Sequence, residues 1–90
     1  MRVELSERAE ADIDAHTTYG NERFGSAQTE RYFWGLERVF ELLADDPAMG
    51  QPVRGGARRF VYKTHYVYYR LEPSRIFVTT VRSARMRPPD

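Results

Sequence analysis

Residues 25–52 read GSAQTERYFWGLERVFELLADDPAMGQP, and they predict a helix around which the rest of the chain packs. The large apolar side chains of this segment recur every three or four positions and so line one side of an α-helix: Phe33, Leu36, Phe40 and Leu43. Ser26 is expected to cap the start, because its hydroxyl can accept a hydrogen bond from a first-turn amide. Pro47 disfavours helical geometry at the residue before it, so the helix should span about residues 27–44.

Upstream of this helix, the sequence predicts a short strand and a first helix. Residues 2–5 alternate polar and apolar side chains, as a half-buried strand does. Ser6 should cap a helix that begins at Glu7, and Gly25 should end that helix in a left-handed conformation. Because Ser26 follows at once, the two helices form a tight hairpin. The inward positions of the first helix make a poor apolar stripe: Ala9, Ile13, His16, Gly20 and Phe24.

Two further features of the second helix bear on its packing. Tyr32, Trp34 and Val39 lie off the main apolar stripe, and we expect them to face the first helix, because helices in hairpins bury two adjoining stripes. Gly35, in the helix interior, costs about 1 kcal/mol relative to alanine. No packing that would compensate for this cost is visible in the sequence.

Downstream, the composition changes to strand-forming residues. Pro47, Gly50 and Pro52 make a rigid, turn-rich exit, and three β-rich segments follow at residues 59–62, 65–71 and 75–82. They predict a three-stranded antiparallel meander. In its middle strand Val67, Tyr69 and Leu71 point one way, and Tyr66, Tyr68 and Arg70 point the other. A helical hairpin can cover only one of these faces, so the other is left with tyrosines among arginines.

The predicted fold is therefore α+β, in the order β-α-α-β-β-β, with a helical hairpin packed on one face of a mainly antiparallel sheet. The predicted core consists of Leu5, Ile13, Phe33, Leu36, Phe40, Leu43, Val67, Tyr69, Ile76 and Val78. Ninety residues suffice for one domain, residues 1–90, in which residues 86–90 are expected to form a loose tail.

Composition excludes several classes of function. The chain has no cysteine, which rules out disulfides and thiolate metal sites, and it has no apolar run long enough to cross a membrane. We expect a cytoplasmic protein. Residues 1–52 hold 5 basic and 11 acidic side chains, a net charge of −6, whereas residues 53–90 hold 9 basic and 2 acidic, a net charge of +7. Either the two halves attract each other, or the basic half binds an acidic partner.

Several local patterns, together with the element order, resemble the ParE branch of the RelE/ParE superfamily of bacterial toxins. They are LSERAEADID at residues 5–14, ERFG at 22–25, ERYFWGLERVFELLADDPAMGQPVR at 30–54, HYVYYRLE at 65–72 and VRSARMRP at 81–88. The most specific of them is the exit from Asp46-Pro47 to Gly50-Gln51-Pro52. The match extends over almost the whole chain.

The resemblance implies a type II toxin that blocks DNA gyrase by protein binding, without catalysis or a cofactor. It also implies a ParD-like antitoxin that wraps the sheet and helices in a hetero-oligomer. Aromatic area beside positive charge favours an antitoxin surface at Arg58, Arg59, Tyr66 and Tyr68. The apolar pattern of the last strand stops at Val81, so we place the gyrase-binding residues just after it: Arg82, Arg85, Met86 and Arg87.

Two alternatives stay open. One is a ribosome-dependent endoribonuclease like RelE, for which the candidate residues are Lys63, His65, Tyr66, Arg70, Arg82 and Arg85. By alignment the strand arginine of RelE falls on Tyr66 and its late arginine on Ala84, which leaves the acid-base set incomplete. The other is a member that only binds its antitoxin. We interpret His16 and His65 as structural residues and expect no metal site.

Overall fold

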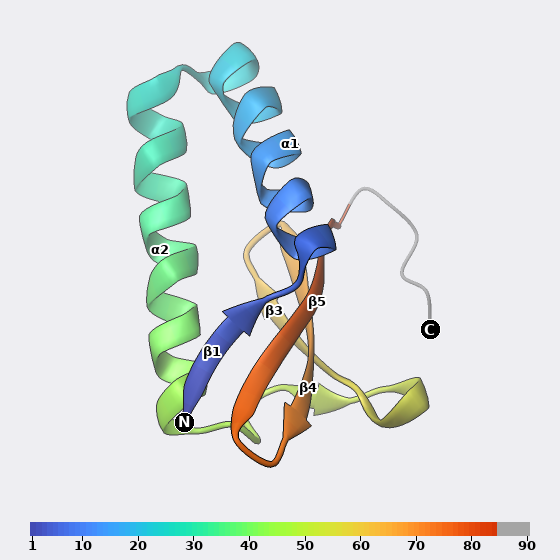
Figure 1. Ribbon diagram of the computed structural model, residues 1–90. Helices are drawn as coiled ribbons and strands as arrows, with labels where there is room; N and C mark the ends of the chain where they lie inside the picture. The colour runs from blue at the N-terminus through green and yellow to red at the C-terminus, as the bar shows by residue number, and fades with distance from the viewer. Residues whose placement is uncertain (85–90) are drawn as a thin grey trace.

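The computed structural model of the protein describes residues 1–84 and shows a helical hairpin beside a five-stranded sheet (Figure 1). In chain order the elements are β1 (Arg2–Leu5), α1 (Glu7–Phe24), α2 (Ser26–Asp45), β2 (Gln51–Pro52), a 3-10 turn (Arg54–Gly56), β3 (Arg58–Tyr62), β4 (His65–Glu72) and β5 (Arg75–Ser83). The predicted α+β class and element order are confirmed. The two-residue strand β2 was not predicted, because two residues are too few to show an alternating pattern.

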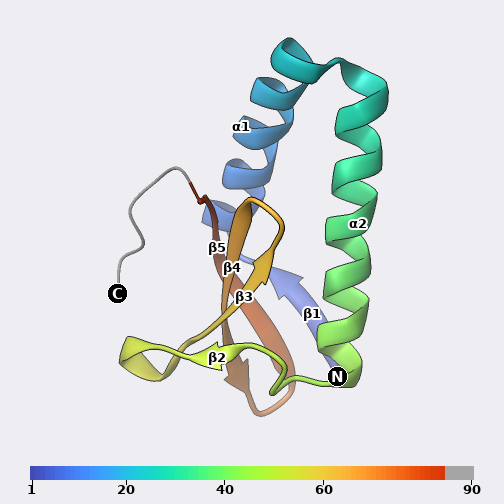
Figure 2. The same ribbon diagram turned by 180° about the vertical axis from the view of Figure 1, so that it is seen from behind.

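The sheet has the strand order β1-β5-β4-β3-β2. β3, β4 and β5 form the predicted antiparallel meander, and β2 adds an antiparallel strand at one edge. β1 pairs in parallel with β5, with Val3 opposite Ile76. The two helices lie on the same side of this sheet, and the tip of their hairpin extends beyond it (Figure 2). No α-helix of residues 1–84 covers the other face of the sheet, which we call the open face.

Apolar side chains between the hairpin and the sheet form the core. Six of the ten predicted core residues are at most 2% exposed: Leu36, Leu43, Val67, Tyr69, Ile76 and Val78. The other four are partly buried and pack against these six: Leu5, Ile13, Phe33 and Phe40. Ala9, Val39 and Val81 also belong to the buried cluster, although they were absent from the predicted list.

An irregularity in β5 explains why Val81 was missed. Tyr68 pairs with Thr80 while Tyr69 pairs with Val78, so Thr79 is an extra residue, as in a β-bulge. The extra residue reverses the alternation beyond it. Val78 and Val81 therefore both face the helices, and Arg82 faces the open side.

Polar side chains of α1 cover the free edge of β5 beyond the end of β1. The Ser6 hydroxyl donates a hydrogen bond to the Thr79 carbonyl at 2.9 Å. The amide of Val81 donates to an Asp12 carboxylate oxygen at 3.0 Å, and His16 Nε2 donates to the Val81 carbonyl at 2.7 Å. These bonds take the place of a neighbouring strand and satisfy backbone groups that would otherwise be unpaired. The interpretation of His16 as a structural residue is thereby supported.

The helix boundaries follow the prediction except at the hairpin turn. Ser6 caps α1 by accepting a hydrogen bond from the Ala9 amide at 3.0 Å. Gly25 has the expected positive φ of 83°, but its ψ of 159° lies outside the left-handed helical region. The assignment of Ser26 as the cap of α2 was wrong, because Gly25, which has no side chain to cap the helix, occupies the cap position. Phe24 was also misplaced, since it is 50% exposed.

The segment that follows α2, residues 46–50, is held against the sheet by hydrogen bonds from two side chains. The Tyr69 hydroxyl donates to the Pro47 carbonyl and accepts from the Gly50 amide, both at 2.8 Å. Arg58 donates to the carbonyl oxygens of Gly50 at 2.6 Å and Ala48 at 3.2 Å. A side chain at position 50 could not fit, because its Cβ would lie 2.7 Å from the Tyr69 hydroxyl oxygen.

The structure corrects one expectation about α2 and adds a packing role that the sequence did not show. Trp34 does not face α1, since it is 63% exposed. Gly35 leaves room for the Tyr62 side chain, because a Cβ at this position would lie 2.0 Å from the Tyr62 hydroxyl oxygen. That hydroxyl donates to the Tyr32 carbonyl at 2.7 Å. The missing side chain of Gly35 therefore lets β3 approach the helix closely.

Candidate functional site

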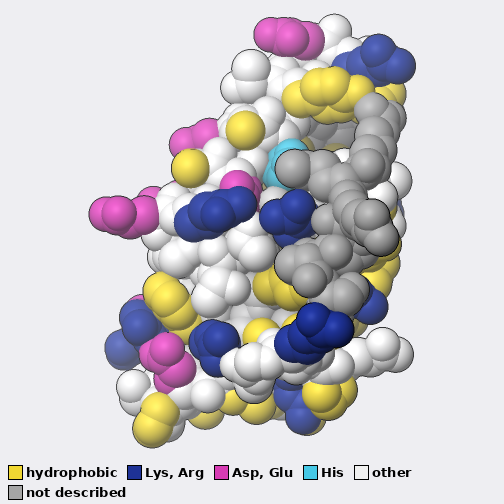
Figure 3. All heavy atoms as spheres, turned by 90° about the vertical axis from the view of Figure 1, so that its right-hand side faces the viewer, with side chains coloured by type: hydrophobic (Ala, Val, Ile, Leu, Met, Phe, Trp, Pro, Cys, Tyr) yellow, Lys and Arg dark blue, Asp and Glu magenta, His cyan; other side chains and the backbone are white. Residues whose placement is uncertain are grey.

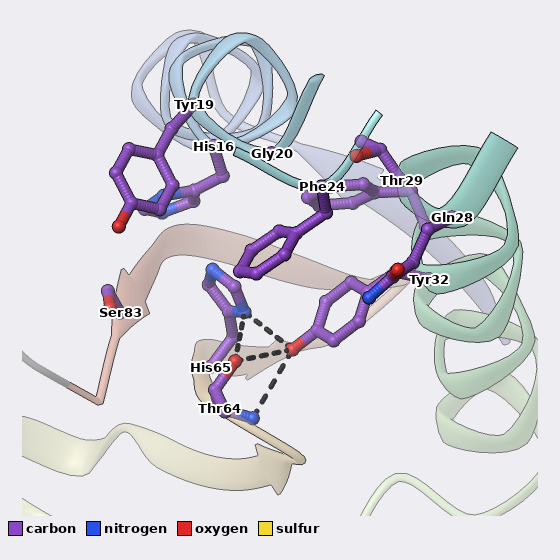
Figure 4. A pocket seen from close by; sticks show the side chains of 11 residues that line it. His16, Tyr19, Gly20, Phe24, Gln28, Thr29, Tyr32, Thr64, His65 and Ser83 are labelled. Atoms are coloured by element: carbon purple, nitrogen blue, oxygen red, sulfur yellow. Dashed lines mark hydrogen bonds between the residues drawn. The ribbon is translucent and has the colours of Figure 1, made fainter. Parts of the chain in front are cut away.

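A largely apolar pocket of about 400 Å³, which we call the hairpin pocket, opens between the tip of the helical hairpin and the turn joining β3 to β4 (Figure 4). α1 contributes His16, Tyr19, Gly20 and Phe24, and α2 contributes Gln28, Thr29, Tyr32 and Phe33. Thr64, His65 and Ser83 close its sheet side. Gly20 is required where the helices meet, because a Cβ there would lie 2.9 Å from the Thr29 hydroxyl oxygen. Tyr19 and Phe24 stay about half exposed, at 45% and 50%, so the pocket has an accessible aromatic rim.

Tyr32 connects α2 to the floor of this pocket. Its hydroxyl lies 2.7 Å from Nδ1 of His65 and accepts a hydrogen bond from the Thr64 amide at 3.2 Å. If Tyr32 donates to His65, the proton of a neutral His65 resides on Nε2. The His65 ring also meets the His16 ring edge to face, with centroids 4.5 Å apart. Two imidazoles thus share one apolar environment.

Burial, together with the positive charge that His16 can carry, lowers the pKa of His65 from its ordinary value of 6.5 to about 4. At neutral pH His65 is therefore uncharged, and only one of its two ring nitrogens carries a proton. The arrangement suits a fixed structural link between α2 and the sheet. It does not provide the readily protonated base that acid-base chemistry near pH 7 needs.

The open face of the sheet carries a different chemistry. Arg59, Tyr66 and Arg82 lie on it, with the Arg59 guanidinium 5.2 Å from the centre of the Tyr66 ring and Arg82 opposite Tyr66 on β5. The loop after β2 folds back over this face, and Val53, Arg54 and Ala57 line a second pocket together with Tyr68 and Arg70. Tyr68 is only 4% exposed.

The four residues predicted for the antitoxin surface do not form one surface. Arg59 and Tyr66 lie together on the open face. Arg58, the neighbour of Arg59 on β3, points to the opposite side and is held by the exit from α2. The expectation that Tyr68 contributes exposed aromatic area was wrong, since Tyr68 is buried. A strand period of two would have separated Arg58 from Arg59 on sequence grounds alone.

Only one of the four residues predicted to bind gyrase can be placed. Arg82 is partly buried near the end of β5, on the open face. Arg85, Met86 and Arg87 lie outside the described residues. Sequence reasoning also missed the hairpin pocket, whose only signals were aromatic residues near Gly20 and Gly25 and a histidine on each side of the fold.

The candidate residues for ribonuclease chemistry are divided between two sides of the sheet. His65 lies in the hairpin pocket, whereas Tyr66, Arg70 and Arg82 belong to the open face. Lys63, in the β3–β4 turn, lies near the rings of Tyr32 and Tyr62.

No group of three or more metal-ligating side chains occurs within residues 1–84. The two helices of the described chain are too polar to cross a membrane.

Comparison with known proteins gives consistent results. The family model for the ParE toxin of the type II toxin-antitoxin system parDE matches residues 3–88. Toxin ParE1 of Caulobacter vibrioides is 41% identical over 70 residues, which cover 74% of this chain and 73% of that protein. A solved structure described as the chromosomal ParDE TA system from P. aeruginosa superposes with a TM-score of 0.82 over 92% of this chain and 95% of that one. At 16% identity, this last match bears on the fold alone.

Proposed function

Because the chain belongs to the ParE family of type II toxin-antitoxin toxins, we propose that it inhibits DNA gyrase by binding it, without catalysing a reaction. The observation that carries the proposal is the extent of the family match, which runs from residue 3 to residue 88. The match therefore includes the end of β5 and the segment after it, where we place the gyrase contacts. The separation of His65 from the arginines of the open face argues against the endoribonuclease alternative.

We place the gyrase contacts on Arg82, Arg85, Met86 and Arg87. Arg82 supports this placement because the bulge at Thr79 turns it away from the core. Arginine side chains are also enriched among the residues that contribute most to protein-protein binding. The contribution of Arg82 to folding is expected to be small in comparison with that of the buried apolar residues around it.

The gyrase proposal can be tested with purified components in a supercoiling assay. The parent chain should inhibit supercoiling, and the double variant Arg82→Ala/Arg85→Ala should lose at least tenfold in inhibitory potency. The matched control Arg23→Ala/Arg31→Ala removes two exposed arginines from the helical hairpin and should inhibit like the parent. A parent chain that leaves supercoiling unchanged at every ratio to gyrase would rule out the proposed function. Equal losses in the two variants would place the contacts elsewhere.

A cognate antitoxin related to ParD is the proposed partner that silences the toxin. Its binding segment is expected to contact Arg59 and Tyr66, which keep exposed area on the open face, rather than Arg58 and Tyr68. The hairpin pocket supplies an apolar site for one of its side chains, because pockets of this size and composition commonly bind apolar groups.

The antitoxin surface can be tested by association kinetics. Arg59→Glu should slow association with the antitoxin and reduce its dependence on salt concentration, as loss of complementary charge does. Arg31→Glu on α2 makes the same change in net charge and serves as the control. If both variants associate at the parent rate at every salt concentration, Arg59 does not belong to the antitoxin surface.

A further inference from the structure

The turn between β3 and β4 holds a lysine in an unusual backbone conformation. Lys63 has a φ of 49°, and it is the one residue other than glycine with a positive φ within residues 1–84. It is the first of two residues, Lys63 and Thr64, that connect Tyr62 to His65 across the turn. Glycine, asparagine or aspartate is favoured at such a position, because most side chains make a positive φ costly. Lysine offers the turn no conformational advantage, so its side chain needs another explanation.

The Lys63 side chain lies over two tyrosine rings. Its Nζ atom is 5.5 Å from the centre of the Tyr62 ring and 5.7 Å from the centre of the Tyr32 ring. The two rings meet edge to face, with their centroids 5.1 Å apart. The face of an aromatic ring attracts a cation that lies within about 6 Å of its centre. We call these three residues, Lys63, Tyr62 and Tyr32, the lysine shelf.

Hydrogen bonds hold the lysine shelf against α2. The Tyr62 hydroxyl donates to the Tyr32 carbonyl at 2.7 Å. The Tyr32 hydroxyl accepts from the Thr64 amide at 3.2 Å and lies 2.7 Å from Nδ1 of His65 (Figure 4). The position of the turn is therefore set before a partner binds. A cation that is positioned in advance loses less conformational entropy on binding than one on an unconstrained turn.

Lys63 has no acidic partner within residues 1–84. It is exposed and forms no ion pair with a described carboxylate, whereas Arg38 on α2, for example, contacts Glu41 at 3.1 Å. An ammonium group has three N–H donors, and the tyrosine rings lie on only part of its surroundings. Lys63 therefore keeps donors for an anion that comes from a partner.

The lysine shelf borders the hairpin pocket. Tyr32 belongs to both, and Thr64, which lines the pocket, directly follows Lys63. Because neighbouring Cα atoms are about 3.8 Å apart, an apolar group in the pocket and an anion at Lys63 can belong to one short peptide segment. In a helical segment, residues up to about four positions apart meet this requirement, since one turn rises about 5.4 Å.

The charges around the lysine shelf favour a single carboxylate over a polyanion. Residues 1–52, which include both helices, have a net charge of −6. Figure 3 shows Asp and Glu side chains along the upper part and one margin of the molecule, with Lys and Arg mainly across the middle and lower part. A nucleic acid has closely spaced phosphates and needs several cations, and it would be repelled by the acidic hairpin. One ammonium beside an apolar pocket instead matches one carboxylate beside an apolar side chain.

We propose that Lys63 binds an aspartate or glutamate of the antitoxin, located within about four residues of the apolar side chain that enters the hairpin pocket. The inference rests on the proposed partnership with an antitoxin and adds a requirement on the antitoxin sequence. It also explains why a lysine occupies the strained position, since asparagine or glycine would fit the turn better but could not bind the carboxylate as a cation.

The proposal is tested by measuring affinity and stability together, with the full chain and the purified full-length antitoxin. Lys63→Asn suits the positive φ, so it should not lower the urea midpoint, yet it should weaken antitoxin binding about tenfold in isothermal titration. Lys63→Arg keeps the charge and should keep most of the affinity. The matched control Arg38→Ala removes an exposed positive charge from α2 and should bind like the parent.

Acetylation gives a second readout, because Lys63 is the only lysine in the sequence. Its rate of modification by an amine-reactive acetylating reagent, followed by mass spectrometry, should fall in the complex. The Met1 amine, which donates to the Ala44 carbonyl near the other end of α2, serves as the reference.

Several outcomes would overturn the proposal. They are parent affinity in Lys63→Asn, an equal loss of affinity in Arg38→Ala, an unchanged acetylation rate of Lys63 in the complex, and a lower urea midpoint in Lys63→Asn, which would assign the lysine a structural role. An antitoxin complex that is indifferent to Lys63 would refute this inference alone. A parent chain that binds no antitoxin would refute the proposed partnership and this inference with it.

Discussion

Replacing Gly35 by alanine should destabilise the protein, although helix propensity alone predicts the opposite. Gly35 lies within α2, where alanine is favoured by about 1 kcal/mol. In the folded protein, however, the new Cβ would lie 2.0 Å from the Tyr62 hydroxyl oxygen and 3.0 Å from the ring carbon that carries it. Tyr62 would have to move, and its 2.7 Å hydrogen bond to the Tyr32 carbonyl would be lost.

The expected change in the free energy of unfolding of Gly35→Ala is the sum of three contributions. Losing the hydrogen bond costs about 0.5–1.5 kcal/mol, and overpacking costs about 1–3 kcal/mol. Subtracting the propensity gain of about 1 kcal/mol leaves a net loss of about 1–3 kcal/mol in the free energy of unfolding. Tyr62→Phe alone should cost about 1 kcal/mol, because it removes the hydrogen bond without adding volume. In Gly35→Ala/Tyr62→Phe the closest clash is absent, so the double variant should nearly match the parent.

The assay is urea denaturation of the parent, the two single variants and the double variant, analysed as a double-mutant cycle. The two single changes should couple by about 2–4 kcal/mol, with the double variant more stable than additivity predicts. The reasoning fails if Gly35→Ala is as stable as the parent. It also fails if the coupling energy is below about 0.5 kcal/mol, which is the usual deviation from additivity for independent sites.

Three further predictions concern stability. Leu36→Ala should cost about 2–5 kcal/mol in chemical denaturation, because Leu36 is only 2% exposed, and a loss below about 0.5 kcal/mol would show that the stripe is not buried. Ser6→Ala should cost about 1–2 kcal/mol, since it removes the cap of α1 and the bond to Thr79, whereas Ser74→Ala in the exposed β4–β5 turn should change little. The His65 pKa of about 4 lies below its unfolded value near 6.5, so the free energy of unfolding should fall as the pH drops through this range. After allowance for solvent screening the loss is roughly 1–2 kcal/mol, and a His65→Gln variant with the parent pH dependence would contradict this assignment.

Periodic patterns predicted the elements of this fold but could not predict where a period is interrupted. The spacing of Leu36 and Leu43 located the buried side of α2, because the fixed period of a helix places residues seven apart on the same face. In β5 the alternation is broken at Thr79, and all residues beyond it change faces. Val81 therefore joins the core while Arg82 turns outward. The five-residue interval between Ile76 and Val81 was the available signal of an extra residue.

The functional surfaces were harder to predict, because they depend on segments that are distant in the sequence. Tyr68 is buried and lines a pocket together with the loop after β2, whose path depends on the positive φ of Gly55, and no local pattern shows where that loop will lie. The hairpin pocket likewise combines the hairpin tip with the β3–β4 turn through the contact of Tyr32 with His65. Composition indicated aromatic and cationic surfaces but could not assign individual residues to them.

The weak apolar stripe of α1 has a structural explanation that also bears on function. A helix packed flat on a sheet needs large apolar side chains, but much of α1 borders the free edge of β5, where backbone groups need hydrogen-bond partners. Asp12 and His16 supply these partners four residues apart, so their polarity serves the edge of the sheet. This arrangement closes the edge of β5 to an added strand as far as Val81. Arg82 follows Val81 and lies on the open face, so a partner that binds Arg82 would approach from that face.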